Sequence, residues 1–199
     1  MKKTLSLLAL AAAPLANAAI SSTFGACAQI APPTVANFPA LSSPIGEAWN
    51  EQVNVTGLIF ADLTTNPGNS GGPTPGVLTG MYDSHFIHYS SLPPGVAIGG
   101  VIFSGPIVAV AWNDNTLDLT DATWGAGGTI YPTGQVGRGV NTSSGGVSVF
   151  GNMLRFNFLN QTGAVDIEQI RVWTQSVPAP GACSLAALGG LAALRRKRR

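Results

Sequence analysis

Glycine and proline punctuate this 199-residue chain so densely that its apolar runs stay short. The sequence contains 25 glycines and 14 prolines. No stretch repeats its apolar residues with the 3.6-residue period of an amphipathic helix. Both residue types disfavour helix interiors, glycine through its backbone entropy and proline through its missing N–H donor. The pattern therefore predicts short β-strands joined by frequent turns.

The expected strands are eight apolar runs: residues 53–60, 84–89, 96–103, 107–112, 136–140, 147–150, 153–158 and 165–173. Residues 63–80 hold three prolines and five glycines, which predicts a loop. Ser104-Gly105-Pro106 suits either a hairpin or a bend between sheets, and Gly151-Asn152 suits a tight hairpin. Such a series of short strands predicts an all-β fold, a single antiparallel β-sandwich of the jelly-roll-like kind.

The N-terminus has the three parts of a secretory signal peptide. Met1-Lys2-Lys3 supplies the charged start, residues 5–13 are apolar, and Ala16-Asn17-Ala18 offers the small residues behind which signal peptidases cut. We therefore expect residues 1–18 to be removed after Ala18. A chance apolar start of a cytoplasmic protein is the alternative.

The C-terminus, residues 177–199, combines a proline motif, an apolar segment and a basic end. Pro178 and Pro180 interrupt any strand or helix. Residues 182–194 are uncharged, but as a helix they would reach only roughly 20 Å of the ~30 Å hydrocarbon core, which predicts transient membrane insertion. The positive-inside rule would hold the basic end in the cytoplasm. That end consists of Arg195, Arg196, Lys197, Arg198 and Arg199. A merely adhesive tail is the alternative.

This order of parts resembles the PEP-CTERM sorting signal of Gram-negative, matrix-forming bacteria. In that family an inner-membrane exosortase cuts near the proline motif and passes the protein to the cell surface or the extracellular matrix. Ala179 stands where the family has glutamate, which leaves the exosortase subtype open. Export would depend on Ala16 and Ala18 at the signal-peptide cut and, as the resemblance implies, on Pro178, Ala179, Pro180 and the five terminal cations at the second cut. Lipidation of Cys183 is an alternative fate of the tail.

Without the two signals, one domain of residues 19–176 remains, and it is acidic. Seven of the ten lysines and arginines lie in the signals, so three arginines face nine aspartates and glutamates, a formal charge of −6. A body without lysine offers no basic surface to a nucleic acid. Cys27 and Cys183 fall on opposite sides of the expected C-terminal cut, so a disulfide between them would not survive it.

Residues 83–172 also resemble a domain that recurs in PEP-CTERM proteins. The resemblance rests on six short pieces in the same order: residues 83–88, 103–110, 117–121, 129–132, 138–139 and 167–172. The chain departs from the pattern at Val140-Asn141, where that domain has an apolar residue and an acid. No chemistry is assigned to the domain, so the resemblance bears on fold and location alone.

Two groups of residues invite a catalytic or metal-binding interpretation. Ser70, in a run of glycines, resembles the nucleophile of trypsin-like proteases, but no histidine precedes it to act as its base. Asp83, His85 and His88 are metal-ligand types, yet alternation along a strand would place the two histidines on opposite faces. We therefore expect a glycine-rich loop and a half-buried strand at these places, and no catalytic residue.

The acidic segment 114–121 could hold Ca²⁺ through Asp114, Asp118 and Asp121, because carboxylate oxygens are usual ligands of that ion. The segment lacks the glycine and the terminal glutamate of an EF-hand loop. An exposed acidic turn is therefore the preferred alternative. Ca²⁺ is the one cofactor that the sequence suggests.

Trp124 is the aromatic residue best placed to contact a sugar. It lies within the glycine-rich segment 122–128, which predicts an exposed loop, whereas Trp112 and Trp173 end apolar runs and are expected in the core. A loop tryptophan folded back on the core is the alternative.

Together these features predict a non-catalytic protein that the secretion machinery and an exosortase-like protease deliver to the cell surface or matrix of a Gram-negative-type bacterium. The alternative is a carbohydrate-binding module for the organism's own exopolysaccharide, using Trp124 and Ca²⁺. A secreted hydrolase is the third hypothesis, and it lacks a paired-carboxylate or nucleophile–base arrangement.

Overall fold

The computed structural model describes residues 15–16, 18–91, 94–143, 145–160 and 167–178. The chain divides into two compact units, Asn17–Val177 and a second made of Met1–Ala16 with Pro178–Arg199. The predicted tail residues from Ala179 to Arg199 lie outside the described residues, as does most of the predicted signal peptide. The short strands β1 (Leu15–Ala16) and β12 (Val177–Pro178) form a two-stranded sheet.

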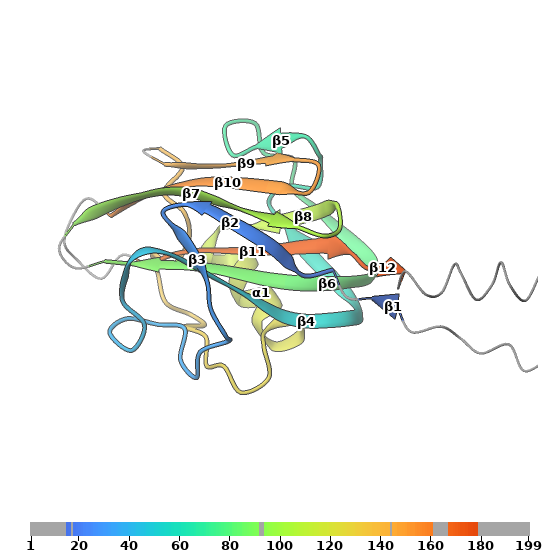
Figure 1. Cartoon of the computed structure of the whole chain (residues 1–199), viewed down its shortest axis with the longest axis horizontal. Helices are drawn as coiled ribbons and strands as arrows, with labels where there is room; N and C mark the ends of the chain where they lie inside the picture. Colours follow the sequence, from blue (N-terminus) through green and yellow to red (C-terminus); the bar gives the residue numbers. More distant parts are fainter. Residues whose placement is uncertain (1–14, 17, 92–93, 144, 161–166, 179–199) are drawn as a thin grey trace, which may run out of the picture. The chain divides into compact units, whose positions relative to one another are not determined.

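The unit Asn17–Val177 contains two five-stranded sheets (Figure 1). The outer sheet has the order β2 (Ile20–Gly25), β7 (Gly95–Phe103), β10 (Met153–Asn160), β9 (Gly146–Phe150) and β5 (Gly68–Asn69). The central sheet has the order β3 (Cys27–Gln29), β4 (Ser43–Ala61), β6 (Gly76–Ser90), β11 (Glu168–Gln175) and β8 (Ile107–Ala111). Neighbouring strands run antiparallel, except that β3 runs parallel to β4.

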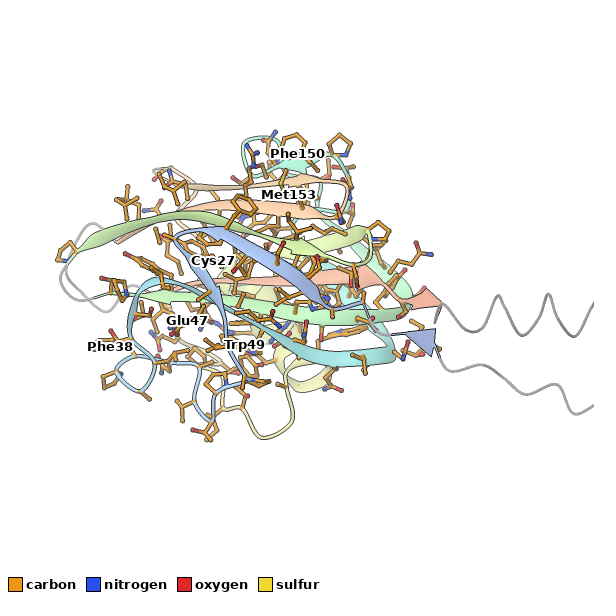
Figure 2. The ribbon with its side chains drawn as sticks, in the orientation of Figure 1. Cys27, Phe38, Glu47, Trp49, Phe150 and Met153 are labelled. Atoms are coloured by element: carbon orange, nitrogen blue, oxygen red, sulfur yellow. The ribbon has the colours of Figure 1, made fainter. Side chains whose placement is uncertain are left out.

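The two sheets pack face to face over one apolar core. Phe156 and Phe158 of the outer sheet meet Ile87 and Ile170 of the central sheet there. A second core lies on the other face of the central sheet, beneath helix α1 (Asp114–Trp124). In Figure 2, Phe150 and Met153 lie on the outer sheet, on the opposite side of the molecule from Trp49. The unit Asn17–Val177 is therefore a β-sandwich with helix α1 packed on the back of its central sheet.

Burial on both faces explains the pattern of β6 and β11. Residues 83–90 of β6 are all buried, and so are residues 168–174 of β11. The outer sheet has only one buried face, so β10 alternates between buried Leu154 and Phe156 and outward Arg155. The central sheet thus forms the interior of the fold, and the outer sheet presents one face to solvent.

The all-β fold class is confirmed, and strands β7, β8, β9 and β10 lie where they were predicted. The prediction of a strand over residues 136–140 is wrong, because that segment is a loop. The predicted loop 63–80 contains β5 and the start of β6. Ser104-Gly105-Pro106 is the bend between sheets, since β7 and β8 belong to different sheets.

The hairpin at Gly151-Asn152 joins β9 to β10 as expected, and Gly151 has a φ of 63°, a left-handed conformation that glycine adopts without strain. Helix α1 was not predicted from the sequence. Among the described ranges of the chain, no helix is both long and apolar enough to span a membrane.

Candidate functional site

The predicted acidic turn is the helix α1. Asp62, at the end of β4, holds its start: one carboxylate oxygen accepts the N–H groups of Trp112 and Asn113 at 2.7 and 2.9 Å. Its other oxygen accepts the Thr116 hydroxyl at 2.9 Å. Only Leu117, Thr120 and Trp124 of the helix are buried, too sparse a pattern to be recognised in the sequence. A carboxylate about fifty residues away therefore stabilises a helix that local propensity does not.

The carboxylates of Asp114 and Asp118 bind backbone N–H groups of the loop after the helix. Asp114 accepts from Gly137 and Gly139, both at 2.7 Å, and Asp118 accepts from Gly134 at 2.9 Å. These contacts hold the loop 133–139 against the helix. The two carboxylates are thus used to position backbone.

Two buried arginines complete a charged network beneath the helix. Arg138 donates to Asp118 and Asp121, both at 2.6 Å, and Arg171 donates to Asp121 at 3.0 Å. Arg171 also forms a two-point ion pair with Glu51, at 2.8 Å for both contacts. Both arginine side chains are fully buried. The pieces of chain on which the family resemblance rests therefore supply much of one buried network.

The network fixes the ionisation of its members. Burial raises the pKa of the Asp121 carboxyl, but the hydrogen bond from Arg138 and the charges of Arg171 and Arg138 outweigh burial, so its pKa lies below the usual value. Burial alone would lower the pKa of Arg171, and Glu51 reverses this and raises it. Burial and Glu51 raise the pKa of Tyr131. Asp121 and Arg171 are therefore charged at neutral pH, and Tyr131 is not.

This geometry bears on the predicted Ca²⁺ ligands. Asp114, Asp118 and Asp121 project from a helix, and each already accepts from donors of the protein. Within the part of the chain that the structure describes, no cluster of three or more histidine, cysteine, aspartate or glutamate side chains is arranged to hold a metal ion. The arrangement is suited to packing the helix and loop on the sheet.

The prediction that Trp124 is exposed is wrong. Its side chain is 0% exposed, its indole N–H donates to the Leu58 carbonyl at 2.9 Å, and its ring meets that of Trp173 edge to face. Because it ends a helix rather than lying in a loop, it points into the second core. Trp124 cannot stack on a sugar in this fold.

The two histidines lie on opposite faces of β6, as predicted. His85 contacts Asn50 and Thr174 at 2.8 and 2.9 Å, and His88 contacts the Leu41 carbonyl and Gln169 at 3.2 and 3.0 Å. Burial lowers the pKa of His85 to about 3 and that of His88 to about 4. Both rings are therefore neutral hydrogen-bonding groups of the core at physiological pH.

The candidate nucleophile Ser70 forms a hydrogen bond to backbone, and the Cys27 thiol is held in its neutral form. The Ser70 hydroxyl accepts the Val147 N–H at 3.0 Å, which fastens the glycine-rich loop to β9. Cys27 is buried at the start of β3, and burial raises the pKa of its thiol to about 12. Neither group has the neighbouring base that a nucleophile needs among the hydrogen bonds of the described residues.

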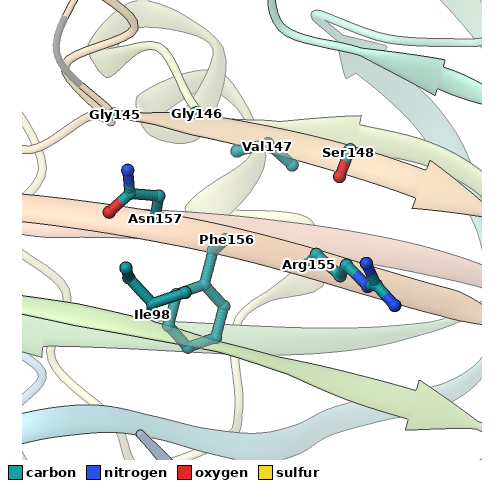
Figure 3. A pocket seen from close by; sticks show the side chains of 8 residues that line it. All are labelled: Ile98, Gly145, Gly146, Val147, Ser148, Arg155, Phe156 and Asn157. Carbon is teal, nitrogen blue, oxygen red and sulfur yellow. The ribbon is translucent and has the colours of Figure 1, made fainter. Parts of the chain in front are cut away.

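The solvent face of the outer sheet holds a shallow open pocket of about 350 Å³, which sequence reasoning missed. It is lined by Ile98 of β7, by residues 145–148 at the start of β9, and by Arg155, Phe156 and Asn157 of β10. Figure 3 shows Arg155 and Asn157 on one strand, with Ser148 and Ile98 on the strands to either side. Strict alternation in Leu154-Arg155-Phe156-Asn157-Phe158 was the signal that could have revealed the outward pair.

Polar groups in this pocket are available to a ligand. Arg155 is exposed and, unlike the other arginines of the described residues, takes part in no ion pair there. The side-chain oxygen of Asn157 is shielded from solvent and accepts no hydrogen bond from the described residues. A guanidinium, an amide and an aliphatic surface together can bind a polar ligand.

Comparisons with protein-family models, curated proteins and solved structures found no match to this chain.

Proposed function

We propose that this chain is a non-catalytic protein exported to the cell surface or extracellular matrix of a Gram-negative-type bacterium. The support is the order of signals in the sequence: a signal peptide over residues 1–18 and the PEP-CTERM-like tail over residues 177–199. Its partners in export are the secretion machinery and an exosortase-like protease, and the tail inserts transiently into the inner membrane.

The non-catalytic role is supported by how the described titratable groups are used. Asp121 and Arg171 are paired with each other, and the side chains of His85 and His88 are neutral and fully buried. The described residues that line the pocket on the outer sheet include Arg155 and no carboxylate that could act as a general acid or base. The chemistry available at that pocket is binding.

Carbohydrate binding is the specific role that the pocket favours. Sugar sites combine a flat apolar surface with a few fixed polar groups. Ile98 is 62% exposed and supplies such a surface, and Asn157 and Arg155 supply the polar groups. We therefore place the sugar contact at this pocket on the outer sheet and not at Trp124, which is buried. The ligand that fits an exported protein of this kind is the organism's own exopolysaccharide.

Export is tested by expressing the full chain in a bacterium that has an exosortase and following it in inner-membrane, surface and culture fractions. We expect surface or medium localisation for the natural chain. Inner-membrane retention is expected when Pro178 and Pro180 are both replaced by alanine, and the same when the five terminal cations are replaced. A neutral exchange in the body, Ser22→Ala, is the control. Unchanged localisation of the two tail variants would contradict the proposal.

Binding is tested by passing the secreted, processed protein over immobilised exopolysaccharide of that bacterium. Retention is expected, and it should not depend on EDTA. A chain that reaches the surface but is not retained would leave export standing and remove the carbohydrate-binding role.

A further inference from the structure

The charge pattern of the outer sheet singles out one side chain. None of its five strands carries an aspartate or glutamate, and Arg155 is their one charged residue. Arg138 and Arg171 are buried in ion pairs on the far side of the central sheet. A molecule whose body carries a formal charge of −6 therefore presents its exposed guanidinium on a sheet free of acids.

The register of β7, β9 and β10 surrounds Arg155 with residues from three strands. On β10, Arg155 lies between Gly100 of β7 and Ser148 of β9. Two residues on, Asn157 lies between Ile98 and Gly146. Gly146 keeps the surface beside Asn157 low, because a side chain at that position would stand next to the Asn157 side chain. A Cβ at Gly146 would meet only the Ser70 hydroxyl within 4 Å, at 3.1 Å. The pocket therefore has room above Asn157.

Apolar side chains border the polar pair on β7 and β2. Ile98 and Val96 are 62% and 53% exposed. The ring of Phe24 on β2 lies over Gly100, across β7 from Arg155. This arrangement matches the two sides of a sugar ring, which has C–H groups on its faces and hydroxyls at its edge. The guanidinium beside them fits a carboxylate with two parallel hydrogen bonds.

We propose that this pocket binds an acidic saccharide, with the carboxylate of a uronic acid residue on Arg155. The ring hydroxyls bind Asn157 and Ser148, and a C–H face of the ring packs on Ile98. This assignment rests on the carbohydrate-binding role proposed above and names its ligand class.

The test compares an acidic polymer with its neutral, reduced form, and with an unrelated neutral polymer. The secreted, processed protein is titrated with polygalacturonate, with the same polymer after reduction of its carboxyl groups to alcohols, and with dextran. We expect binding to polygalacturonate to be at least about tenfold tighter than to the reduced polymer, as loss of a charged hydrogen-bonded pair implies. Binding should weaken with salt, because the attraction is between exposed charges.

Variants of the two polar residues sharpen the test. Arg155→Gln should lose about tenfold in affinity, and Arg155→Lys should recover only part of it, since an ammonium lacks the two-point geometry. Asn157→Asp keeps the side-chain shape but places a negative charge beside Arg155, so it should weaken binding of the acidic polymer more than that of the reduced polymer. Ser22→Ala, on β2 outside the pocket, is the matched control, and thermal unfolding verifies that each variant is folded.

The outcomes separate this inference from the proposed function. Equal binding to natural and reduced polymer, unaffected by Arg155→Gln, would overturn the acidic-saccharide assignment and leave carbohydrate binding intact. Equal affinity for polyglutamate would make the pocket a general carboxylate site and overturn it as well. No binding to any of these polymers, by a protein that still reaches the cell surface, would remove the saccharide ligand and leave export standing.

Discussion

Arg171 and Glu51 form a two-point ion pair in which both side chains are 0% exposed, with Nε–Oε2 and Nη2–Oε1 distances of 2.8 Å. They lie on β11 and β4, which are separated by β6 in the central sheet. The guanidinium spans that strand by lying over the ring of Phe86, 4.8 Å from its centroid. The pair thus joins two strands that do not touch through their backbones, directly under the helix.

Removal of one partner from this pair should destabilise the fold strongly. Arg171→Met leaves the Glu51 carboxylate buried with the Tyr131 hydroxyl as its remaining donor, and we expect a loss of about 3–5 kcal/mol in the free energy of unfolding. The double variant Glu51→Gln, Arg171→Met should recover part of that loss, since no unpaired charge remains. Urea unfolding followed by tryptophan fluorescence measures both. Arg155→Met, at the exposed arginine, is the control and should change stability by less than about 0.5 kcal/mol. A similar loss of unfolding free energy in Arg171→Met and in Arg155→Met would contradict the role of the pair.

Trp124 should act as a core residue. Trp124→Ala removes a fully buried ring together with its hydrogen bond to the Leu58 carbonyl, and we expect about 3–5 kcal/mol of destabilisation. Trp124→Phe should cost less because most of the ring volume stays. Phe150, which is 51% exposed, offers the control: Phe150→Ala should cost far less than Trp124→Ala. Loss of saccharide binding by a Trp124→Phe protein of unchanged stability would contradict this assignment.

Much of the outer sheet could be predicted because each strand reports its own environment. In β10 the apolar residues alternate with Arg155 and Asn157, since one face is buried and the other is in water. The length of β6 could not be predicted, because its first residues, 76–80, read as loop from their glycines and pair along β4 only in the folded protein. The alternation of apolar and polar residues therefore predicts a strand with one solvent-exposed face better than a strand that is buried on both faces.

The helix and the candidate site depend on residues far apart in the chain. Helix α1 needs Asp62 at its start and Arg138 and Arg171 beside its carboxylates, none of which is local to it. From the sequence alone, where these partners cannot be seen, the acidic residues of segment 114–121 predict an exposed turn. The pocket could not be predicted from the sequence for the same reason, because the residues that surround Arg155 come from the neighbouring strands β7 and β9.

Ca²⁺ should have no effect on the stability of this protein. Asp114 already accepts the N–H groups of Gly137 and Gly139, and Asp121 binds two arginines, so an ion would have to displace existing contacts. Melting temperatures in excess CaCl₂ and in EDTA should agree. Asp114→Ala should lower stability by about 1–3 kcal/mol in both solutions, through its two orphaned loop N–H groups. Stabilisation by Ca²⁺ that disappears in an Asp114→Ala, Asp118→Ala variant would restore the metal site.

Acid should begin to destabilise this protein at a pH above the range in which carboxylates titrate, because of its two neutral histidines. In His88 the ring Nε2–H donates to the Leu41 carbonyl, so Nδ1 accepts from the Gln169 amide. The Gln169 side-chain amide cannot flip to present its oxygen to His88, since that oxygen accepts from Arg138 Nε at 2.9 Å. A proton on Nδ1 would therefore face another N–H group. His85 donates its Nδ1–H to Asn50 and has its Nε2 beside the Thr174 hydroxyl, and burial lowers its pKa.

The sign of the pH dependence follows from the lowered pKa values. The unfolded chain binds a proton on each histidine near pH 6.5, whereas the folded protein does so only near about 3 for His85 and about 4 for His88. Stability is thus complete above pH 6.5 and falls as the pH decreases toward 4, by up to about 1.4 kcal/mol per pH unit for each ring. Asp121, whose pKa is also lowered, adds a loss only below the usual carboxyl range. Free energies of unfolding measured in urea at several pH values between about 7 and 5 should show this slope, and His88→Gln should reduce it by about half. A flat profile over that interval would mean that the rings are protonated in the folded protein.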